Sequence, residues 1–149
     1  MILIADRNRH VRQFLKREFV ADGYLVVLAE NRYDLCRIIN HEEVLDLLIL
    51  DDEFLGPDES RMVEQLGSRI PPLPVILHSF SAETVDPSLV AAAAVLVEKT
   101  GNIEELKEAV RQVLRREYPC RSDPGDPRPS EQDAGNSGDP ACTMGTRKA

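Results

Sequence analysis

Five short apolar runs, separated by longer segments with the spacing of amphipathic helices, constrain the fold of this chain more than any other feature. Each run is short enough to form a strand that is buried on both faces of a sheet. The runs are Ile2–Ala5, Leu25–Leu28, Leu47–Leu50, Val75–Leu77 and Val95–Val97. Strict alternation of strands and helices favours an α/β domain with a parallel sheet and helices on both faces, because parallel neighbours need right-handed crossovers.

The segments between the runs predict the helices. Apolar residues recur there at three- and four-residue intervals, as on the buried face of a helix. These positions are Val11, Phe14, Leu15 and Phe19, then Leu35, Ile38 and Ile39, then Met62, Val63 and Leu66, and finally Leu106, Ala109, Val110, Val113 and Leu114. Gly23 can cap the first helix in the left-handed conformation. Between Ala82 and Ala94 the pattern is weaker, and Asp86-Pro87 predicts a short or mobile fourth helix.

The composition changes abruptly near Tyr118. From Pro119 onward there is no Val, Ile, Leu or aromatic residue, whereas five of the 10 prolines and four of the 8 glycines fall here. Such a segment cannot bury enough apolar surface to fold. We therefore expect one domain over residues 1–118 and a disordered tail over residues 119–149, which serves either as a tether or as a solvated extension.

Charge and cysteine content exclude several classes of protein. The formal net charge is −8 and no basic stripe is present, which argues against nucleic-acid binding. The apolar runs are too short to span a bilayer, and the amino terminus lacks a signal peptide's apolar region. Three scattered cysteines, Cys36, Cys120 and Cys142, predict neither a disulfide framework nor a zinc site. We expect a cytoplasmic protein that contacts neither nucleic acid nor membrane.

Charged and hydroxyl side chains follow four of the five apolar runs. Asp6 comes after the first run, Asp51 after the third, Ser79 after the fourth and Lys99 after the fifth. In open parallel sheets, ligands bind beyond the carboxyl ends of the strands. Any one of these residues could belong to a solvated rim, but four at corresponding strand ends predict a common site.

The segments around these residues resemble the CheY-like receiver domain of two-component response regulators, from Met1 to about Glu117. Asp46–Asp51 matches the family's acceptor strand, and Leu55–Asp58 matches the loop that follows it. Pro74–Ser79 matches the strand that ends in Ser or Thr, and Val95–Lys99 matches the strand that carries the conserved Lys. The resemblance implies a doubly wound five-stranded parallel sheet with strand order 2-1-3-4-5, in a flavodoxin-like three-layer sandwich.

The resemblance also implies a role for each strand-end residue. Asp51 corresponds to the phosphoryl acceptor, because a carboxylate can attack phosphorus and form a mixed anhydride. Ser79 and Lys99 correspond to the hydroxyl and the ammonium that contact the phosphoryl group. A structural alternative for Lys99 is an ion pair with Asp51 or Asp6. The resemblance implies a non-enzymatic receiver that is phosphorylated by a histidine kinase or phosphotransfer protein. Because the sequence shows no output domain after Tyr118, we expect a single-domain receiver that signals to a downstream protein.

A Mg²⁺ site is also implied, and here the sequence departs from the family. Asp6, Asp51 and the backbone carbonyl of Glu53 match the expected ligands, but Arg7 stands where a second coordinating carboxylate belongs. A guanidinium offers only donors, so we expect weak metal binding. Asp52 or Glu53 could lend a carboxylate, although strand alternation aims Asp52 away from Asp51. Alternatively, Arg7 lies over Asp51 as a substitute cation, or it points to solvent and the site is disabled.

Two further interpretations of the sequence compete with an active receiver. At Leu96 the family commonly has an aromatic residue that rotates on activation, and Lys99 is followed by Thr100-Gly101 where proline is frequent. The alternative is a degenerate pseudo-receiver, a phosphorylation-independent interaction module in which Arg7, Lys99 and the carboxylates form a permanent charge cluster. A flavodoxin-like flavin protein would need a phosphate loop rich in glycine and hydroxyl groups after the first strand, and Arg7–His10 is not such a loop.

Overall fold

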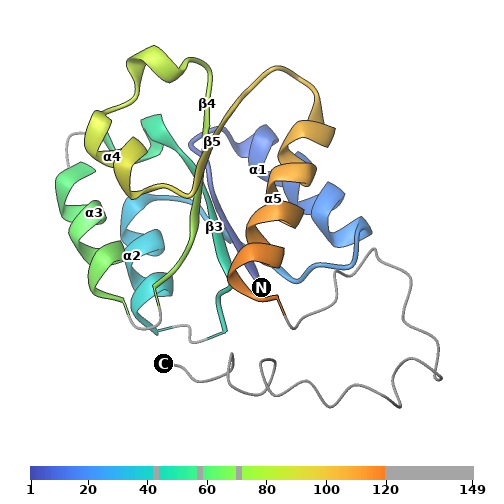
Figure 1. Cartoon of the computed structure of the whole chain (residues 1–149), viewed down its shortest axis with the longest axis horizontal. Helices are drawn as coiled ribbons and strands as arrows, with labels where there is room; N and C mark the ends of the chain where they lie inside the picture. The colour runs from blue at the N-terminus through green and yellow to red at the C-terminus, as the bar shows by residue number, and fades with distance from the viewer. Residues whose placement is uncertain (42–43, 57–58, 70–71, 120–149) are drawn as a thin grey trace.

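The computed structural model describes residues 1–41, 44–56, 59–69 and 72–119. Its five strands form one parallel sheet in the order β2-β1-β3-β4-β5, which confirms the predicted fold class (Figure 1). The strands are β1 (Ile2–Ala5), β2 (Val26–Ala29), β3 (Leu47–Asp51), β4 (Val75–Ser79) and β5 (Val95–Glu98). Compared with the prediction, β2 begins one residue later, and β3 and β4 extend far enough to include Asp51 and Ser79.

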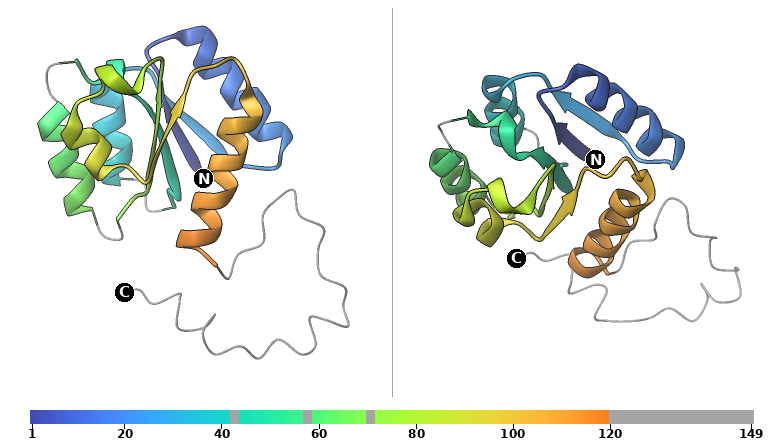
Figure 2. Two further views of the ribbon diagram at one scale, coloured as in Figure 1. Left: turned by 45° about the horizontal axis from the view of Figure 1, so that its top comes forward. Right: turned by 90° about the horizontal axis from the view of Figure 1, so that it is seen from above.

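Helices cover both faces of the sheet, as expected for a three-layer sandwich. One face carries α1 and α5, and the other carries α2, α3 and α4 (Figure 2). The helices are α1 (Arg9–Ala21), α2 (Arg32–His41), α3 (Glu59–Ser68), α4 (Pro87–Ala92) and α5 (Ile103–Glu117), with 3₁₀ turns η1 (Asp52–Phe54) and η3 (Ala82–Thr84). The fourth helix is short, as its weak pattern predicted. None of the described helices is long and apolar enough to cross a membrane.

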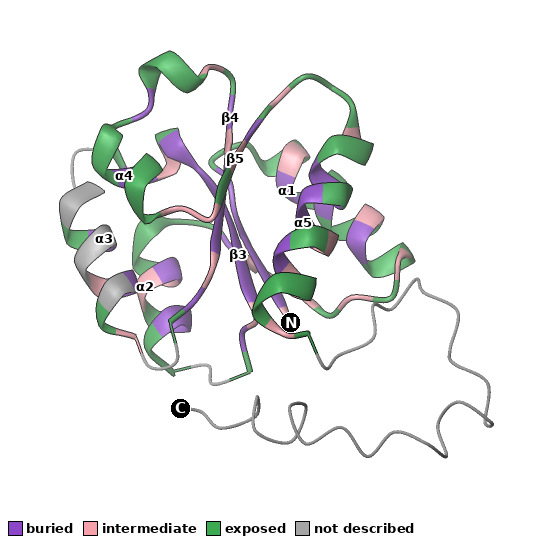
Figure 3. Ribbon diagram, viewed as in Figure 1, coloured by how far each residue is buried: buried purple, intermediate pink, exposed green. Residues whose placement is uncertain are grey.

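The apolar core consists of two clusters, one on each face of the sheet, and the buried strands run between them (Figure 3). Alternation along β3 assigns Leu47 and Ile49 to the α1–α5 side, whereas Leu48 belongs to the α2–α4 side. The same alternation continues to the end of the strand. It assigns Asp51 to the α1–α5 side and, along β4, Ser79 to the α2–α4 side. Asp52 begins η1, and its side chain meets Ser79.

The loop between β1 and α1 is tight, and this places the start of α1 directly beside the sheet edge. The Asn8 side chain accepts hydrogen bonds from the backbone N–H groups of His10 and Val11, which caps the helix. At its other end the helix is followed by Gly23 with φ 95, the left-handed conformation that the sequence predicted. The predicted tail falls outside the described residues from 120 onward.

Candidate functional site

The carboxyl edge of the sheet brings together two aspartates and one lysine, which we call the acid–lysine cluster. Asp6 follows β1, Asp51 ends β3 and Lys99 follows β5. The Lys99 Nζ lies 2.9 Å from Asp6 Oδ2 and 3.2 Å from Asp51 Oδ1, and each side chain exposes 9% or less of its surface. Buried carboxylates require a cation or hydrogen bonds. Here one ammonium is shared by two carboxylates.

Backbone N–H groups also stabilise the negative charges of the two aspartates. The N–H of Asn8 donates to Asp6 Oδ1 at 2.8 Å. The N–H of Glu53 donates to Asp51 Oδ1 at 3.3 Å, and the N–H of Arg7 donates to Asp51 Oδ2 at 3.4 Å. Such charge-assisted bonds stabilise ionised carboxylates. Every carboxylate oxygen of the cluster therefore faces a donor, and Asp51 Oδ2 has the longest of these contacts.

Ser79 lies at the same edge, but its hydroxyl is engaged with residues outside the cluster. The Ser79 Oγ donates to the carbonyl oxygen of Ser81 at 3.1 Å and accepts from the Ser81 N–H. Burial raises the pKa of the Asp52 carboxyl, a hydrogen bond from Ser79 opposes that shift, and the negative charge of Asp51 adds to it. Because the hydroxyl has one proton to donate, Asp52 and Ser81 compete for it.

Arg7 turns its side chain away from Asp51. Its guanidinium forms an ion pair with the Glu53 carboxylate, and both side chains are well exposed. Only the Arg7 backbone N–H meets Asp51. Lys99, and not the Arg7 guanidinium, is therefore the cation beside Asp51, as in the ion-pair alternative that the sequence left open.

The acid–lysine cluster does not fit a Mg²⁺ ion as its side chains stand. Mg²⁺ demands oxygen ligands in near-ideal octahedral geometry, but the oxygens of Asp6 and Asp51 are directed at Lys99 and at backbone N–H groups. Within the described ranges, no three His, Cys, Asp or Glu side chains are placed to hold a metal. The Glu53 carboxylate is paired with Arg7. A metal would first have to displace Lys99.

His78 is a neighbour of the cluster to which the sequence reasoning assigned no chemistry. It lies beside Asp51 in the β3–β4 register. Burial lowers the pKa of His78 to about 4, and the positive charge of Lys99 lowers it as well. The negative charges of Asp6 and Asp51 act in the opposite direction and raise this pKa. The imidazole is therefore neutral at pH 7. Its buried Nδ1 has no hydrogen-bond partner among the described residues. Strand alternation, which places His78 on the same face as Ile76, was the available signal.

Arg12 is a second residue that sequence reasoning missed. Its side chain is buried under the β1–α1 loop, and Nη1 donates to the carbonyl oxygens of Asp6 at 2.7 Å and Arg7 at 3.4 Å. These contacts fix the backbone that carries the Asp6 carboxylate and the Arg7 N–H. The helical pattern predicts a polar residue at position 12, but nothing in it indicates a buried guanidinium.

Comparison with curated proteins finds relatives of one kind. No family model matches the sequence. The transcriptional regulatory protein TctD of Salmonella typhimurium is 28% identical over 117 residues, and the response regulator MprA of a Mycobacterium species is 29% identical over 120 residues. The matches cover 77% and 79% of this chain and 52% of each relative. The chain thus spans about half the length of these relatives.

Two solved structures are similar to this chain over almost their whole length. The response regulator TrrA of Thermotoga maritima in complex with Mg²⁺-BeF matches with a TM-score of 0.66 and 30% identity, covering 76% of this chain and 97% of that one. In its complex with the histidine kinase ThkA, TrrA matches with a TM-score of 0.64 and 31% identity, at the same coverage. The order and direction of the strands therefore agree with those of proteins that share almost a third of their residues with this chain.

Proposed function

We propose, from the premise that this chain belongs to the receiver-domain family of response regulators, that it accepts a phosphoryl group on Asp51 in two-component phosphorelay signalling. Its homologues are response regulators. One observation carries the proposal: Asp51 ends a buried parallel strand with the Lys99 ammonium at 3.2 Å. A carboxylate beside a fixed cation suits nucleophilic attack on an anionic donor, because the cation offsets the charge that gathers there.

The chemical step begins at the Asp51 carboxylate and its surrounding donors. An oxygen of Asp51 attacks the phosphorus of a phosphohistidine or of acetyl phosphate. The new O–P bond forms as the donor's P–N or P–O bond breaks. The leaving group is neutral imidazole, from a phosphohistidine whose other ring nitrogen already carries a proton, or acetate. Asp51 Oδ2 is the better nucleophile, since its contact with the Arg7 N–H is long.

Phosphorylation redistributes the partners of Lys99. The new phosphoryl group carries about two negative charges and draws the ammonium away from Asp6, which it contacts at 2.9 Å. Ser79 then turns its hydroxyl from Ser81 or Asp52 toward a phosphoryl oxygen. Mg²⁺ binds weakly, because Lys99 occupies the carboxylates that it needs. These local movements change the surface that a protein partner recognises.

The partners follow from the same proposal. The donor is a histidine kinase or a phosphotransfer protein, by analogy with the complex of TrrA with ThkA. The receiver is a substrate and carrier of the phosphoryl group, not an enzyme, and it passes the signal to a downstream protein in the cytoplasm. Its net charge of −8 opposes contact with nucleic acid or with anionic membranes.

The test is phosphorylation by acetyl phosphate, followed by intact-mass and peptide-mapping mass spectrometry. We expect one phosphoryl adduct on Asp51 that forms slowly at millimolar Mg²⁺ and faster at higher concentrations. Asp51→Asn should abolish the adduct, and Asp52→Asn, the matched control at the adjacent carboxylate, should retain it. Rapid labelling at ordinary Mg²⁺ would show that Arg7 and the Lys99 contacts do not impede the metal.

A second candidate function, a pseudo-receiver without phosphoryl chemistry, is favoured by one specific observation. The cluster is closed, because Asp51 is 1% exposed and both of its oxygens already have donors. Arg7→Asp separates the two functions. An active receiver should bind metal more tightly and label faster in this variant, whereas a permanently paired interaction module should gain neither. Arg9→Asp, at an exposed position two residues away, controls for the change in net charge.

A further inference from the structure

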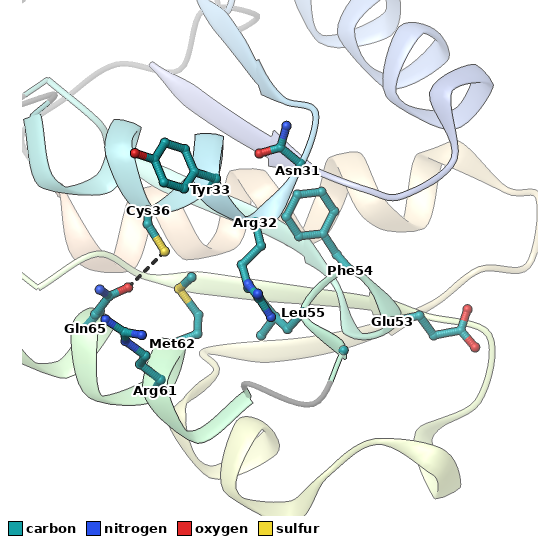
Figure 4. A pocket seen from close by; sticks show the side chains of 11 residues that line it. Asn31, Arg32, Tyr33, Cys36, Glu53, Phe54, Leu55, Arg61, Met62 and Gln65 are labelled. Atoms are coloured by element: carbon teal, nitrogen blue, oxygen red, sulfur yellow. Dashed lines mark hydrogen bonds between the residues drawn. The ribbon is translucent and has the colours of Figure 1, made fainter.

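Two hollows lie on opposite faces of the sheet. The larger, of about 690 Å³, lies between the start of α2, η1 and α3, and its described lining contains no member of the acid–lysine cluster (Figure 4). The smaller, of about 230 Å³, lies between the starts of α1 and α5, and we call it the α1–α5 pocket. Its lining includes His78 and Lys99. Because Lys99 also pairs with Asp51, the α1–α5 pocket adjoins the acid–lysine cluster.

The walls of the α1–α5 pocket are mostly apolar. Val11, Phe14 and Leu15 come from α1. Ile103 and Leu106 come from the first turn of α5. Leu15 and Leu106 are buried and form its floor. Apolar cavities of about 150 Å³ can bind benzene, so a hollow of about 230 Å³ has room for one aromatic ring with a substituent.

Two exposed phenylalanines stand at the rim of the pocket, and each ring already faces a cation. The exposed fraction is 39% for Phe14 and 70% for Phe80. The guanidinium carbon of Arg17 lies 5.8 Å from the centroid of the Phe14 ring, and Lys99 Nζ lies 4.9 Å from the centroid of the Phe80 ring. A cationic ligand would be repelled by these two charges. The rim therefore favours an aromatic ligand without a positive charge.

An anionic ligand finds no free cation in the described lining. Lys99 is the one charged residue there, and its ammonium is shared between Asp6 and Asp51. An anion would have to compete with two buried carboxylates for one ammonium, and both carboxylates would repel it. The charges around the pocket therefore favour an uncharged ligand.

His78 supplies a hydrogen-bonding group that the fold leaves unsatisfied. It lines the pocket, and its buried Nδ1 has no hydrogen-bond partner among the described residues. Buried polar atoms without a partner are uncommon in folded proteins. A neutral imidazole has one donor and one acceptor nitrogen, and a hydroxyl group can bond to either. A ligand hydroxyl therefore suits His78 in both tautomers.

We propose that the α1–α5 pocket binds a small uncharged aromatic alcohol, a single ring that carries a hydroxyl group. The ring packs against Phe14, Phe80 and the apolar floor, and the hydroxyl forms a hydrogen bond with the His78 imidazole. Burial of the ring from water and this hydrogen bond act together. Binding does not require the proposed phosphoryl chemistry, although Lys99 belongs to both sites.

The test is a ¹H–¹⁵N NMR titration of the full chain with three single-ring probes. Phenol has the hydroxyl, benzene lacks it, and benzoate carries a negative charge in its place. We expect phenol to shift the amides of Gly101, Asn102 and Ile103, which line the pocket. Its dissociation constant should be about three- to tenfold lower than that of benzene, as one hydrogen bond implies. Benzoate should bind more weakly than phenol.

Two pairs of variants locate the probe. His78→Phe keeps a ring of similar shape without hydrogen-bonding atoms and should reduce phenol binding to that of benzene. His41→Phe, at an exposed position of α2, is its control and should retain the preference for phenol. Val11→Phe fills the pocket and should weaken binding of both phenol and benzene. Val20→Phe, on the same helix, exposed and outside the lining, should leave binding unchanged.

Three results would overturn the proposal. The first is equal binding of phenol and benzene, or tighter binding of benzoate, by the wild-type chain. The second is phenol binding that survives Val11→Phe, which keeps the test valid if His78→Phe does not fold. The third is movement of the same amides with protein concentration and not with added phenol, because a second copy of the chain would then occupy the pocket.

Discussion

Asp51 and Asp52 are adjacent in sequence and both are buried, yet they lie in different electrostatic surroundings. Asp51, on the α1–α5 side of the sheet, meets the Lys99 ammonium and two backbone N–H groups. Asp52, on the α2–α4 side, meets the Ser79 hydroxyl, and burial raises its pKa. One step along the chain exchanges a cation for a neutral hydroxyl, because the strand ends at Asp51 and Asp52 begins the 3₁₀ turn η1. The partner, and not burial alone, decides how a carboxylate at this edge behaves.

The two sides also differ in how easily they can rearrange. On the α1–α5 side, Lys99 is held by two carboxylates, and moving it would leave both carboxylates buried without a cation, which is unfavourable. On the hydroxyl side, Ser79 has two acceptors within reach and one proton to share between them. Ser79 can therefore change its acceptor at small cost, whereas movement of Lys99 leaves two buried carboxylates without their cation.

The largest effect is expected from removing the cation. Lys99→Met leaves Asp6 and Asp51 buried without their ammonium, and should lower the free energy of unfolding by about 3–5 kcal/mol. The matched control is Lys107→Met: this lysine is also buried, but its partners Glu18 and Asp22 are each 31% exposed. It should cost about 1 kcal/mol. Urea denaturation measures both values, and equal losses would contradict the special position of Lys99.

A smaller loss of stability is expected on acidification, because His78 binds a proton more readily in the unfolded chain than in the folded one. Its pKa of about 4 lies below the value of 6.5 expected in the unfolded chain. The unfolded state therefore binds more protons between these values, and stability is fully present above pH 6.5 and lost as the pH falls toward 4. From pH 7 to pH 5 this loss amounts to about 2 kcal/mol.

The check on His78 is urea denaturation at both pH values. His78→Gln should remove this part of the pH dependence, since the group that titrates is gone. His10→Gln, at an exposed position, serves as the control and should retain it. The charged neighbours Lys99, Asp6 and Asp51 are unchanged in both variants. A pH dependence that is the same in His78→Gln as in the wild type would contradict the assignment.

The smallest change in stability is expected from a substitution at Asp52, beside the Ser79 hydroxyl. Asp52→Asn removes a buried charge and keeps an oxygen that can accept from Ser79, so it should raise stability at pH 7 by up to about 1 kcal/mol. The raised pKa means that the folded state binds more protons than the unfolded state as pH falls toward the ordinary aspartate range. The advantage of Asn should therefore shrink between pH 7 and pH 4. Destabilisation at pH 7 would indicate that Asp52 has a cationic partner.

Much of the fold could be predicted because the spacing of apolar residues, which identifies strands and helices, is a property of the local sequence. The apolar runs predicted the strands to within two residues at their ends. Burial on both faces was also expected of every run, but it holds only for the inner strands β1, β3 and β4, because the edge strands β2 and β5 are partly exposed. The parallel direction and the common edge follow from the crossover rule. The meeting of Asp6, Asp51 and Lys99 at that edge is a consequence of this topology.

The partners of individual side chains could not be predicted in the same way. Whether Arg7 turns to Asp51 or to Glu53 depends on rotamers of long side chains, which a strand-end pattern does not determine. The shared position of Lys99 depends on the reach of its side chain from β5 to β1 across two intervening strands. Tertiary packing buries Arg12 and half-buries His78. The sequence around Arg12 gives no sign of its burial, and for His78 the only signal is its alternation with Ile76 along the strand.

The most direct test of the central claim, that Asp51 accepts a phosphoryl group beside Lys99, is a beryllofluoride titration followed by ¹H–¹⁵N NMR at increasing Mg²⁺ concentration. Beryllofluoride mimics the phosphoryl group on a carboxylate. We expect shifts centred on the amides of Arg7, Glu53 and Lys99 at raised Mg²⁺, lost in Asp51→Asn and retained in Asp52→Asn. An absence of shifts at every Mg²⁺ concentration, or shifts that persist in Asp51→Asn, would contradict it.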